Sequence, residues 1–336
     1  MLGCMIETSL GVTAMAHLSP LADWIDLDAP LLVAHDPFAG VTYDGARMHM
    51  PQGPGVGVRQ RSRAESEVAS TLNKWRQGRY ADNSITYFRP YLKANDKGKA
   101  IVVGEVLTAD QAKAVEGLAA AQGISANLRI RMKEETPRAW VTRVVSDLRR
   151  RPTSLSERLN QAILGDAVRI LAVHQTRMEW CYVQLGRDGY LGWLQREALS
   201  PPEPEQSPEP PTHLIRTPWA EGFDDADPRS PFLGRLPIAL PVEAEEQAAG
   251  YTRLRLPNGR RWWVNDKCLL RLEDRPTPTP TGVQFCLELV DSLKGVPYLW
   301  GGCTPFGYDC SGFTQMFYVL MGVGLSRDAG QQFCQG

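Results

Sequence analysis

Two proline-rich stretches interrupt the sequence and strongly limit how it can fold. Residues 201–211 contain six prolines separated mostly by glutamates, and residues 276–281 alternate proline with threonine. Proline lacks a backbone N–H and fixes its own φ, so such stretches form extended connectors rather than parts of a core. A chain of 336 residues also has room for two or three domains, at about 100–200 residues each. We therefore expect a multidomain α+β protein.

A further Pro-Gly cluster at 51–55 marks an earlier break. The resulting blocks are 1–61, 62–138, 139–200, the linker 201–211, 212–275, the linker 276–281, and 282–336. Block 62–138 reads as a small α/β segment, with a helix over 109–122 between strands at 100–103 and 128–132. We assign no chemistry to it.

Blocks 139–200 and 212–275 are patterned as short strands. The first has apolar runs at 140–145, 167–173 and 180–185, then the hairpin sequence DGYLGW at 188–193. The second has runs at 251–256 and 261–264 around a Pro-Asn-Gly turn. Both blocks resemble bacterial SH3-like domains, and that resemblance implies two small β-barrels, which leave few strand edges exposed.

Composition excludes several classes of function. The net charge of −1 provides no basic face for nucleic acid, and no run of 18 apolar residues could cross a membrane. The N-terminus does not read as a secretory signal. Seven cysteines without a C-x-x-C pair indicate reduced thiols, and we expect a cytoplasmic protein. No cofactor or metal site is indicated, because a zinc site from Cys303, Cys310 and Cys334 would need closer spacings and a fourth ligand. Oligomeric state stays open.

Cys310 is the candidate nucleophile. Residues 297–312 read PYLWGGCTPFGYDCSG, and apolar residues at helical spacing follow to Met321. A thiol in the first turn of that helix lies at the positive end of the helix dipole, which favours the thiolate. The backbone N–H of Cys310 is a candidate oxyanion donor. The alternative is a buried structural cysteine, our interpretation of five others: Cys4, Cys181, Cys268, Cys286 and Cys334.

The string around Cys310, with LSRD at 325–328, closely resembles the NlpC-type cysteine peptidases of cell-wall peptides. The resemblance implies a papain-like fold with Cys310 as nucleophile and with Tyr298, Asp309 and Ser311 on the substrate side of the cleft. It also implies a histidine base on a later strand, oriented by a polar residue. No histidine follows Cys310. We therefore expect 282–336 to be the N-terminal half of such a domain, and this chain alone to be inactive. Ala329 replaces a serine of some relatives.

SH3-like blocks ahead of such a domain resemble the γ-D-glutamyl-L-diamino acid endopeptidases. The resemblance implies cleavage of murein tripeptides or tetrapeptides after D-Glu when the N-terminal L-Ala is free. It further implies that a tyrosine and an acid of the first SH3-like domain hold the substrate ammonium. Tyr190 in DGYLGW matches the tyrosine, and Glu157 is our candidate acid. A carboxylate facing a buried ammonium would reject acylated substrates.

Residues 1–61 carry a second resemblance. CMIETSLG at 4–11, DLDAPLL at 26–32 and GPGVGV at 53–58 resemble the C-terminal end of an enolase-superfamily dipeptide epimerase. The resemblance implies a (β/α)-barrel remnant in which Asp26 and Asp28 bind a dipeptide ammonium. The epimerase's lysines and metal-binding acids lie on earlier strands that this sequence lacks, so we expect no epimerase activity.

The two resemblances fit together, since the peptidase would release L-Ala-D-Glu, the dipeptide that such epimerases convert. The sequence thus favours a cysteine endopeptidase of murein-peptide recycling, as part of an epimerase–endopeptidase fusion. The alternative is a non-catalytic module of SH3-like domains that binds cell-wall peptides or proteins and carries a degenerate peptidase remnant. An artificial join of neighbouring genes is a third possibility.

Overall fold

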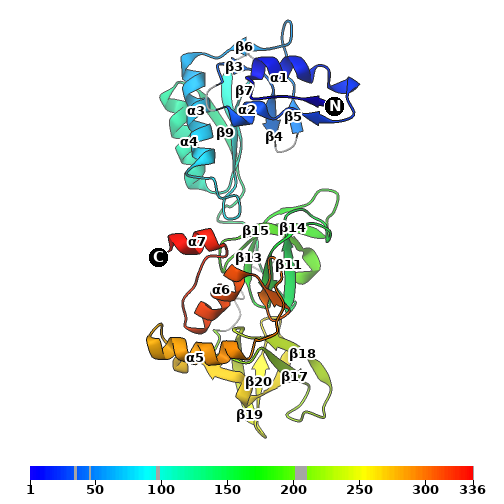
Figure 1. Cartoon of the computed structure of the whole chain (residues 1–336), viewed down its shortest axis with the longest axis vertical. Coiled ribbons are helices and arrows are strands. Elements are labelled where there is room, and N and C mark those ends of the chain that lie inside the picture. Colours follow the sequence, from blue (N-terminus) through cyan, green and yellow to red (C-terminus); the bar gives the residue numbers. More distant parts are fainter. Residues whose placement is uncertain (34–35, 45–46, 96–98, 201–209, 336) are drawn as a thin grey trace. The chain divides into compact units, whose positions relative to one another are not determined.

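The computed structural model describes residues 1–33, 36–44, 47–95, 99–200 and 210–335. Two compact units make up the chain, Met1–Glu134 and Glu135–Gly336 (Figure 1). The blocks that the sequence separates at residue 61 therefore belong to one unit. Most of the predicted linker 201–211 lies outside the described residues, which resume at residue 210. No described helix is both long and apolar enough to cross a bilayer.

The first 60 residues of the N-terminal unit form small paired strands and short helices. The elements are β1 (Leu2–Gly3), α1 (Ser9–Ala16), η1 (Ser19–Leu21), β2 (Ile25–Asp26), α2 (Ala29–Leu32), β3 (Phe38–Ala39), β4 (Thr42–Asp44), β5 (Arg47–His49) and β6 (Arg59–Gln60). Strand β1 pairs in parallel with β2, whereas β3–β6 and β4–β5 are antiparallel. In the described residues these are three separate two-stranded sheets, and the barrel remnant stays a prediction.

The rest of this unit is a three-stranded sheet covered by two helices. The elements are α3 (Arg63–Gln77), β7 (Phe88–Ala94), β8 (Ala100–Val106), α4 (Ala109–Ala121) and β9 (Ser125–Ile130). Strands β8 and β9 are parallel and joined by α4, while β7 runs antiparallel to β8. The predicted helix and the strand before it are confirmed, and the strand after it is present but covers Ser125–Ile130 instead of 128–132. Apolar residues of α3 and α4, such as Leu72 and Val115, pack on Phe88 and Val102 of the sheet.

A capping box fixes the start of α3. The Ser62 hydroxyl accepts a hydrogen bond from the Glu65 N–H, and the Glu65 carboxylate accepts one from the Ser62 N–H. Loss of such a cap typically costs about 1 kcal/mol. In Ser62→Ala we therefore expect α3 amides to exchange hydrogen about fivefold faster by local opening. Ser66→Ala, inside the helix, is the control and should leave exchange unchanged or slower; equal effects of the two changes would contradict the capping role.

The second unit contains two antiparallel sheets. The first has the order β10-β13-β14-β15-β11-β12 and consists of β10 (Arg138–Trp140), β11 (Val145–Arg149), β12 (Arg158–Ile163), β13 (Ala167–Val173), β14 (Trp180–Leu185) and β15 (Leu191–Gln195). The second has the order β18-β17-β21-β20-β19-β16-β22 and consists of β16 (His213–Ile215), β17 (Trp219–Phe223), β18 (Phe232–Pro237), β19 (Pro241–Ala248), β20 (Tyr251–Arg255), β21 (Arg261–Asn265) and β22 (Leu269–Arg271). Short turns η2 (Arg196–Ala198), η3 (Asp266–Cys268) and η4 (Leu272–Asp274) end these segments. Each sheet encloses its own apolar cluster.

The predicted strands 167–173 and 180–185 are confirmed as β13 and β14, but a single strand over 140–145 is wrong. Strand β10 ends at Trp140 and β11 begins at Val145. Between them the backbone bonds to Asp166 and Leu164 in the turn between β12 and β13, and to Ala198 in η2. The chain therefore turns a corner where the sequence pattern is continuous.

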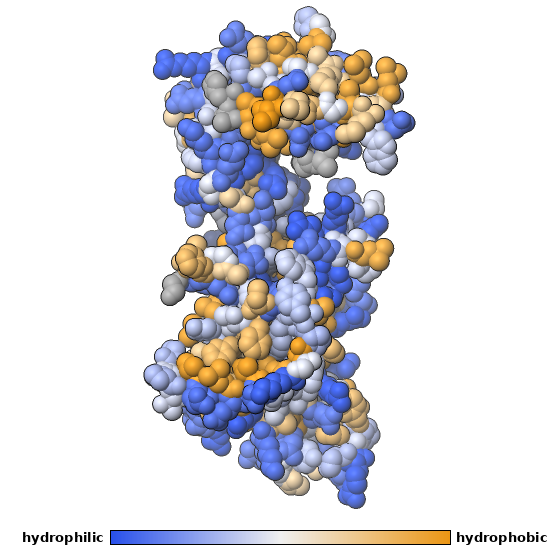
Figure 2. All heavy atoms as spheres, viewed as in Figure 1, coloured by the Kyte–Doolittle hydropathy of each residue, from blue (hydrophilic) through white to orange (hydrophobic). Residues whose placement is uncertain are grey.

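The C-terminal segment is helical apart from one small hairpin. It consists of α5 (Pro280–Asp291), β23 (Cys303–Thr304), β24 (Gly307–Tyr308), α6 (Cys310–Leu320) and α7 (Ala329–Cys334). Thr279 caps α5, so the predicted linker 276–281 is wrong at its last two residues, which begin the helix. Helices α5 and α6 share a core with Ile238, which follows β18 of the second sheet. Figure 2 shows apolar side chains gathered over α5 and α6.

Candidate active site

Cys310 is the first residue of α6, as predicted, and its side chain is exposed. Asp309 caps the helix by accepting a hydrogen bond from the Gly312 N–H at 2.7 Å. Within the described residues, the Cys310 sulfur forms no hydrogen bond and its N–H donates none. A pocket of about 310 Å³ opens beside it, lined by Leu293, Val296, Pro297, Tyr298, Tyr308, Asp309, Cys310 and Phe313. The thiol thus borders a pocket large enough for a small peptide group.

Glycines let the backbone around Cys310 pack closely. A Cβ on Gly302 would lie 2.3 Å from the carbonyl oxygen of Gly307, across the β23–β24 hairpin. Gly301 has φ +71°, and a Cβ there would lie 2.8 Å from the carbonyl oxygen of Arg158 in β12. Only glycine fits both constraints without displacement of the backbone. The hairpin and the first sheet are therefore in direct backbone contact.

A buried ion pair holds the residues on either side of Cys310. The Arg327 guanidinium, 1% exposed, donates to the two Asp309 carboxylate oxygens at 2.9 and 2.6 Å and to the Ser311 hydroxyl at 2.9 Å. The N–H groups of Gly301 and Gly312 also donate to Asp309. Burial alone would raise the pKa of Asp309, but the hydrogen bonds and charge of Arg327 outweigh it and lower that pKa. Asp309 is therefore ionised at neutral pH.

Strand β12 anchors this ion pair to the first sheet. Arg327 donates from Nε to the Asn160 side-chain oxygen at 2.8 Å, and Asn160 is fully buried. Next to it, the Gln161 side-chain oxygen accepts from the Cys303 N–H at 3.0 Å and the Thr304 hydroxyl at 3.1 Å. Asn160 and Gln161 thus fix both the hairpin and the loop after α6.

Sequence reasoning gave no role to Arg327, Asn160 or Gln161. The sequence does contain a signal for Arg327, because Asp309 and Arg327 are the only charged residues between 295 and 327. Opposite charges isolated in an apolar segment are expected to pair when they are buried. Nothing comparable marks the two residues of β12.

Tyr190 and Glu157, the predicted ammonium-binding residues, both contact the C-terminal segment, but at different points. The Tyr190 hydroxyl lies 3.2 and 3.3 Å from the carboxylate oxygens of Asp328. Glu157 accepts a hydrogen bond from the Trp300 indole at 3.1 Å and one from Arg150 at 2.6 Å. Tyr190 is buried and Glu157 is exposed. Their joint role stays a prediction.

The remaining predicted residues divide between the units. Tyr298 is 66% exposed at the mouth of the Cys310 pocket, and Ser311 is buried against Asp309. Asp26 and Asp28 are exposed in the N-terminal unit, in β2 and before α2. Among the five cysteines interpreted as buried, Cys334 is exposed, and that interpretation is wrong because α7 is a short surface helix.

Cys4 and Cys268, in the same group, are half-buried. The described part of the chain contains no cluster of three His, Cys, Asp or Glu residues that could hold a metal ion.

Comparisons with known proteins identify two domains. Residues 148–199 match the family described as the bacterial dipeptidyl-peptidase Sh3 domain, and residues 295–336 match the NlpC/P60 family. The chain carries an SH3 domain and an NlpC/P60 domain. The second match contains Cys310, Asp309 and Arg327, and the first contains β12 and Tyr190. The hydrogen bonds between β12 and the Cys310 segment therefore join the two domains.

The chain is also similar to two known enzymes and to one solved structure. A γ-D-glutamyl-L-lysine dipeptidyl-peptidase of Bacillus cereus is 28% identical over 216 residues, 59% of this chain and 60% of that protein. An L-Ala-D/L-Glu epimerase of Bacillus subtilis is 47% identical over 62 residues, 17% of each chain. The solved structure of an NlpC/P60 family protein from Bacillus cereus has a TM-score of 0.50 at 22% identity, over 58% of this chain and 76% of that one, which shows the fold alone.

The chain spans about three fifths of the length of the dipeptidyl-peptidases that it matches.

Proposed function

We propose that this protein is a cysteine peptidase that hydrolyses the γ-D-Glu–diamino acid bond of murein peptides with a free N-terminal L-Ala. The observation that carries the proposal is the exposed Cys310 sulfur at the start of α6, beside a pocket of about 310 Å³. Two similar proteins are γ-D-glutamyl-L-lysine dipeptidyl-peptidases, and this supports the choice of the bond that is cleaved. The 62-residue match to an L-Ala-D/L-Glu epimerase and the free thiols support a role in cytoplasmic peptide recycling.

In the proposed mechanism the Cys310 thiolate attacks the γ-carbonyl carbon of D-Glu. A C–S bond forms, the carbonyl oxygen takes the negative charge, and the Cys310 N–H donates to it. The C–N bond then breaks, the amine of the diamino acid leaves with the proton that the Cys310 thiol lost on ionisation, and a thioester remains. Water hydrolyses that thioester and releases L-Ala-D-Glu. Asp309 already accepts hydrogen bonds from Gly301, Gly312 and Arg327, so its part is to hold the loop and helix that carry these groups.

Thiol reactivity tests the nucleophile. With dilute iodoacetamide at pH 7, peptide mapping should show Cys310 as the first of the seven cysteines to be alkylated. Cys334 is the matched control, because it too is exposed but lies at the end of the six-residue helix α7. Faster labelling of Cys334 than of Cys310 would contradict an activated Cys310.

Substrate binding tests the specificity. In calorimetric titrations of Cys310→Ala, L-Ala-γ-D-Glu-L-Lys should bind at least about tenfold more tightly than its N-acetylated form, since acylation removes the ammonium charge. Glu157→Gln should reduce this preference, whereas Glu221→Gln, in an exposed ion pair of the second sheet, should not. Equal binding of both peptides would refute the proposed recognition of a free amine.

A measurement of peptide cleavage distinguishes the proposed enzyme from the alternative, a non-catalytic binding module. No histidine follows Cys310 in the sequence, so we propose that these 336 residues alone bind the peptide without cleaving it. A longer gene product that supplies a histidine after Cys310 should cleave it, and Cys310→Ala should abolish that cleavage. Binding without cleavage in such a product would favour the non-catalytic module.

A further inference from the structure

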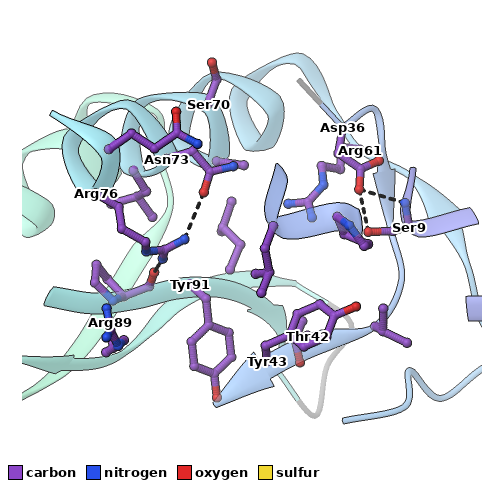
Figure 3. Close-up of a pocket in the computed structure, with 18 residues that line it drawn as sticks. Ser9, Asp36, Thr42, Tyr43, Arg61, Ser70, Asn73, Arg76, Arg89 and Tyr91 are labelled. Carbon is purple, nitrogen blue, oxygen red and sulfur yellow. Dashed lines mark hydrogen bonds between the residues drawn. The ribbon is translucent and has the colours of Figure 1, made fainter. Parts of the chain in front are cut away.

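A pocket of about 420 Å³ lies inside the N-terminal unit, between α3, β7 and segments of the first 61 residues (Figure 3). Its apolar lining includes Leu31, Val41 and Leu72, and its polar lining includes Thr42 and Asn73. The volume falls within the range of about 300–1,000 Å³ typical of small-molecule sites. None of the residues discussed above for peptide hydrolysis lines it.

Arg61, Arg76 and Arg89 line this pocket, and Arg61 and Arg76 enter it without an ion-pair partner among the described residues. Arg76 donates to the Asn73 side-chain oxygen at 3.0 Å and to the Pro90 carbonyl at 2.7 Å, and its buried Nε has no acceptor among the described residues. Arg61 donates from Nε to the Phe38 carbonyl at 2.7 Å. In the part of the chain that the structure describes, neither guanidinium bonds to a carboxylate.

The nearby acids are already engaged. Asp36 accepts hydrogen bonds from the Ser9 N–H and hydroxyl and from the Phe38 N–H, and Glu65 pairs with Arg59. Burial lowers the pKa of Arg61, an effect that Asp36 and Glu65 only partly offset. A partly buried cation without a directly bonded counter-ion is unfavourable, and a bound anion would relieve that cost.

The two guanidinium groups come from opposite ends of one helix. Arg61 lies just before α3 and Arg76 in its last turn. At 1.5 Å per residue, their backbones are therefore roughly 20 Å apart along α3. Figure 3 shows the two side chains entering from different ends of the pocket, with apolar side chains between them. Arg89 lies beside Arg76, so the pocket has cations at both ends and an apolar middle. This arrangement favours a ligand with an anionic group at each end.

We propose that this pocket binds a small aliphatic dicarboxylate, with one carboxylate at Arg61, the other at Arg76, and the hydrocarbon chain along Leu31, Val41 and Leu72. The planar guanidinium matches the geometry of a carboxylate, which explains arginine rather than lysine at both positions. The inference is independent of the peptidase activity and of Cys310.

Calorimetric titration of the whole chain with succinate, glutarate, adipate and pimelate tests this proposal, with hexanoate as the monocarboxylate of the same carbon number as adipate. At low ionic strength, at least one dicarboxylate should bind about tenfold or more tightly than hexanoate. Arg61→Gln and Arg76→Gln should each reduce its affinity to the level of hexanoate. Arg129→Gln, an exposed arginine of the same unit, is the matched control and should leave the affinity unchanged.

Arg76 also connects α3 to β7 through its hydrogen bond to the Pro90 carbonyl, so Arg76→Gln could prevent folding. Arg76→Lys, which keeps the positive charge, is therefore included as a second variant. Arg76→Lys should retain preference for the dicarboxylate over hexanoate. The proposal is overturned if no dicarboxylate binds, if hexanoate binds equally well, or if Arg129→Gln weakens binding as much as Arg61→Gln does. The last result would show only non-specific attraction to a positive surface.

Discussion

Arg327→Met should destabilise the C-terminal unit by about 3–5 kcal/mol, the largest effect that we expect from any single change in this protein. The substitution leaves the Asp309 carboxylate buried without its cation. The Ser311 hydroxyl and the Asn160 side-chain oxygen also lose the hydrogen bonds that Arg327 donates to them. Breaking one partner of a buried ion pair is costly because the remaining charge is poorly solvated. Urea unfolding followed by tryptophan fluorescence would measure the loss. The matched control is Arg235→Met, whose exposed pair with Glu221 should contribute less than about 1 kcal/mol.

The pH dependence gives an independent check on this pair. Because its folded-state pKa lies below the ordinary value of 3.8, Asp309 stabilises the native protein above that pH, and this contribution is lost as the pH falls through the folded-state pKa. In Arg327→Met, burial dominates and raises the pKa of Asp309, so protonation relieves the unpaired charge. The stability gap between the two proteins should therefore be widest near pH 7 and shrink towards pH 4. A gap that is constant with pH would contradict the assignment.

A double substitution separates the ion pair from simple packing. Adding Asp309→Asn to Arg327→Met removes the unpaired charge while keeping the helix cap, since the asparagine oxygen can still accept from the Gly312 N–H. The double variant should therefore be more stable than Arg327→Met alone. If it is less stable, the cost of Arg327→Met comes from lost packing volume.

Local sequence patterns correctly predicted those elements whose formation depends mainly on residues close to them in the sequence. Strands β13 and β14 are runs of mostly apolar residues, and α4 carries its own cap at Thr108. The position of Cys310 follows from the helical spacing after it. Predicting these features requires no knowledge of contacts between residues that are distant in the sequence. The NlpC/P60 resemblance and the SH3 resemblance of block 139–200 likewise rest on strings of adjacent residues, and both are confirmed. The SH3 resemblance of block 212–275 stays a prediction.

Features set by tertiary contact could not be predicted in the same way. The break between β10 and β11 arises because Val141 and Thr142 bond to segments 25 and 56 residues away (141 to 166 and 142 to 198), and no local residue marks it. Asn160 and Gln161 resemble ordinary polar residues of a strand until the C-terminal segment packs on them. The joining of residues 1–61 and 62–134 into one unit depends on contacts across a glycine-rich turn that reads as a boundary.

Gly302→Ala should cost about 1–3 kcal/mol and displace Cys310, although it adds one methyl group. The new Cβ would lie 2.3 Å from the Gly307 carbonyl oxygen and 2.9 Å from that of Leu299, and both are backbone atoms that cannot rotate away. The β23–β24 hairpin must then open, which weakens the Asp309 N–H bond to the Gly302 carbonyl at the start of α6. Thermal unfolding would report the stability, and the iodoacetamide rate of Cys310 would report the local change. Gly330→Ala is the matched control, because a Cβ there meets no atom within 4 Å and alanine favours the helix α7. If Gly302→Ala and Gly330→Ala behave alike, the close backbone contact beside Cys310 does not position the thiol.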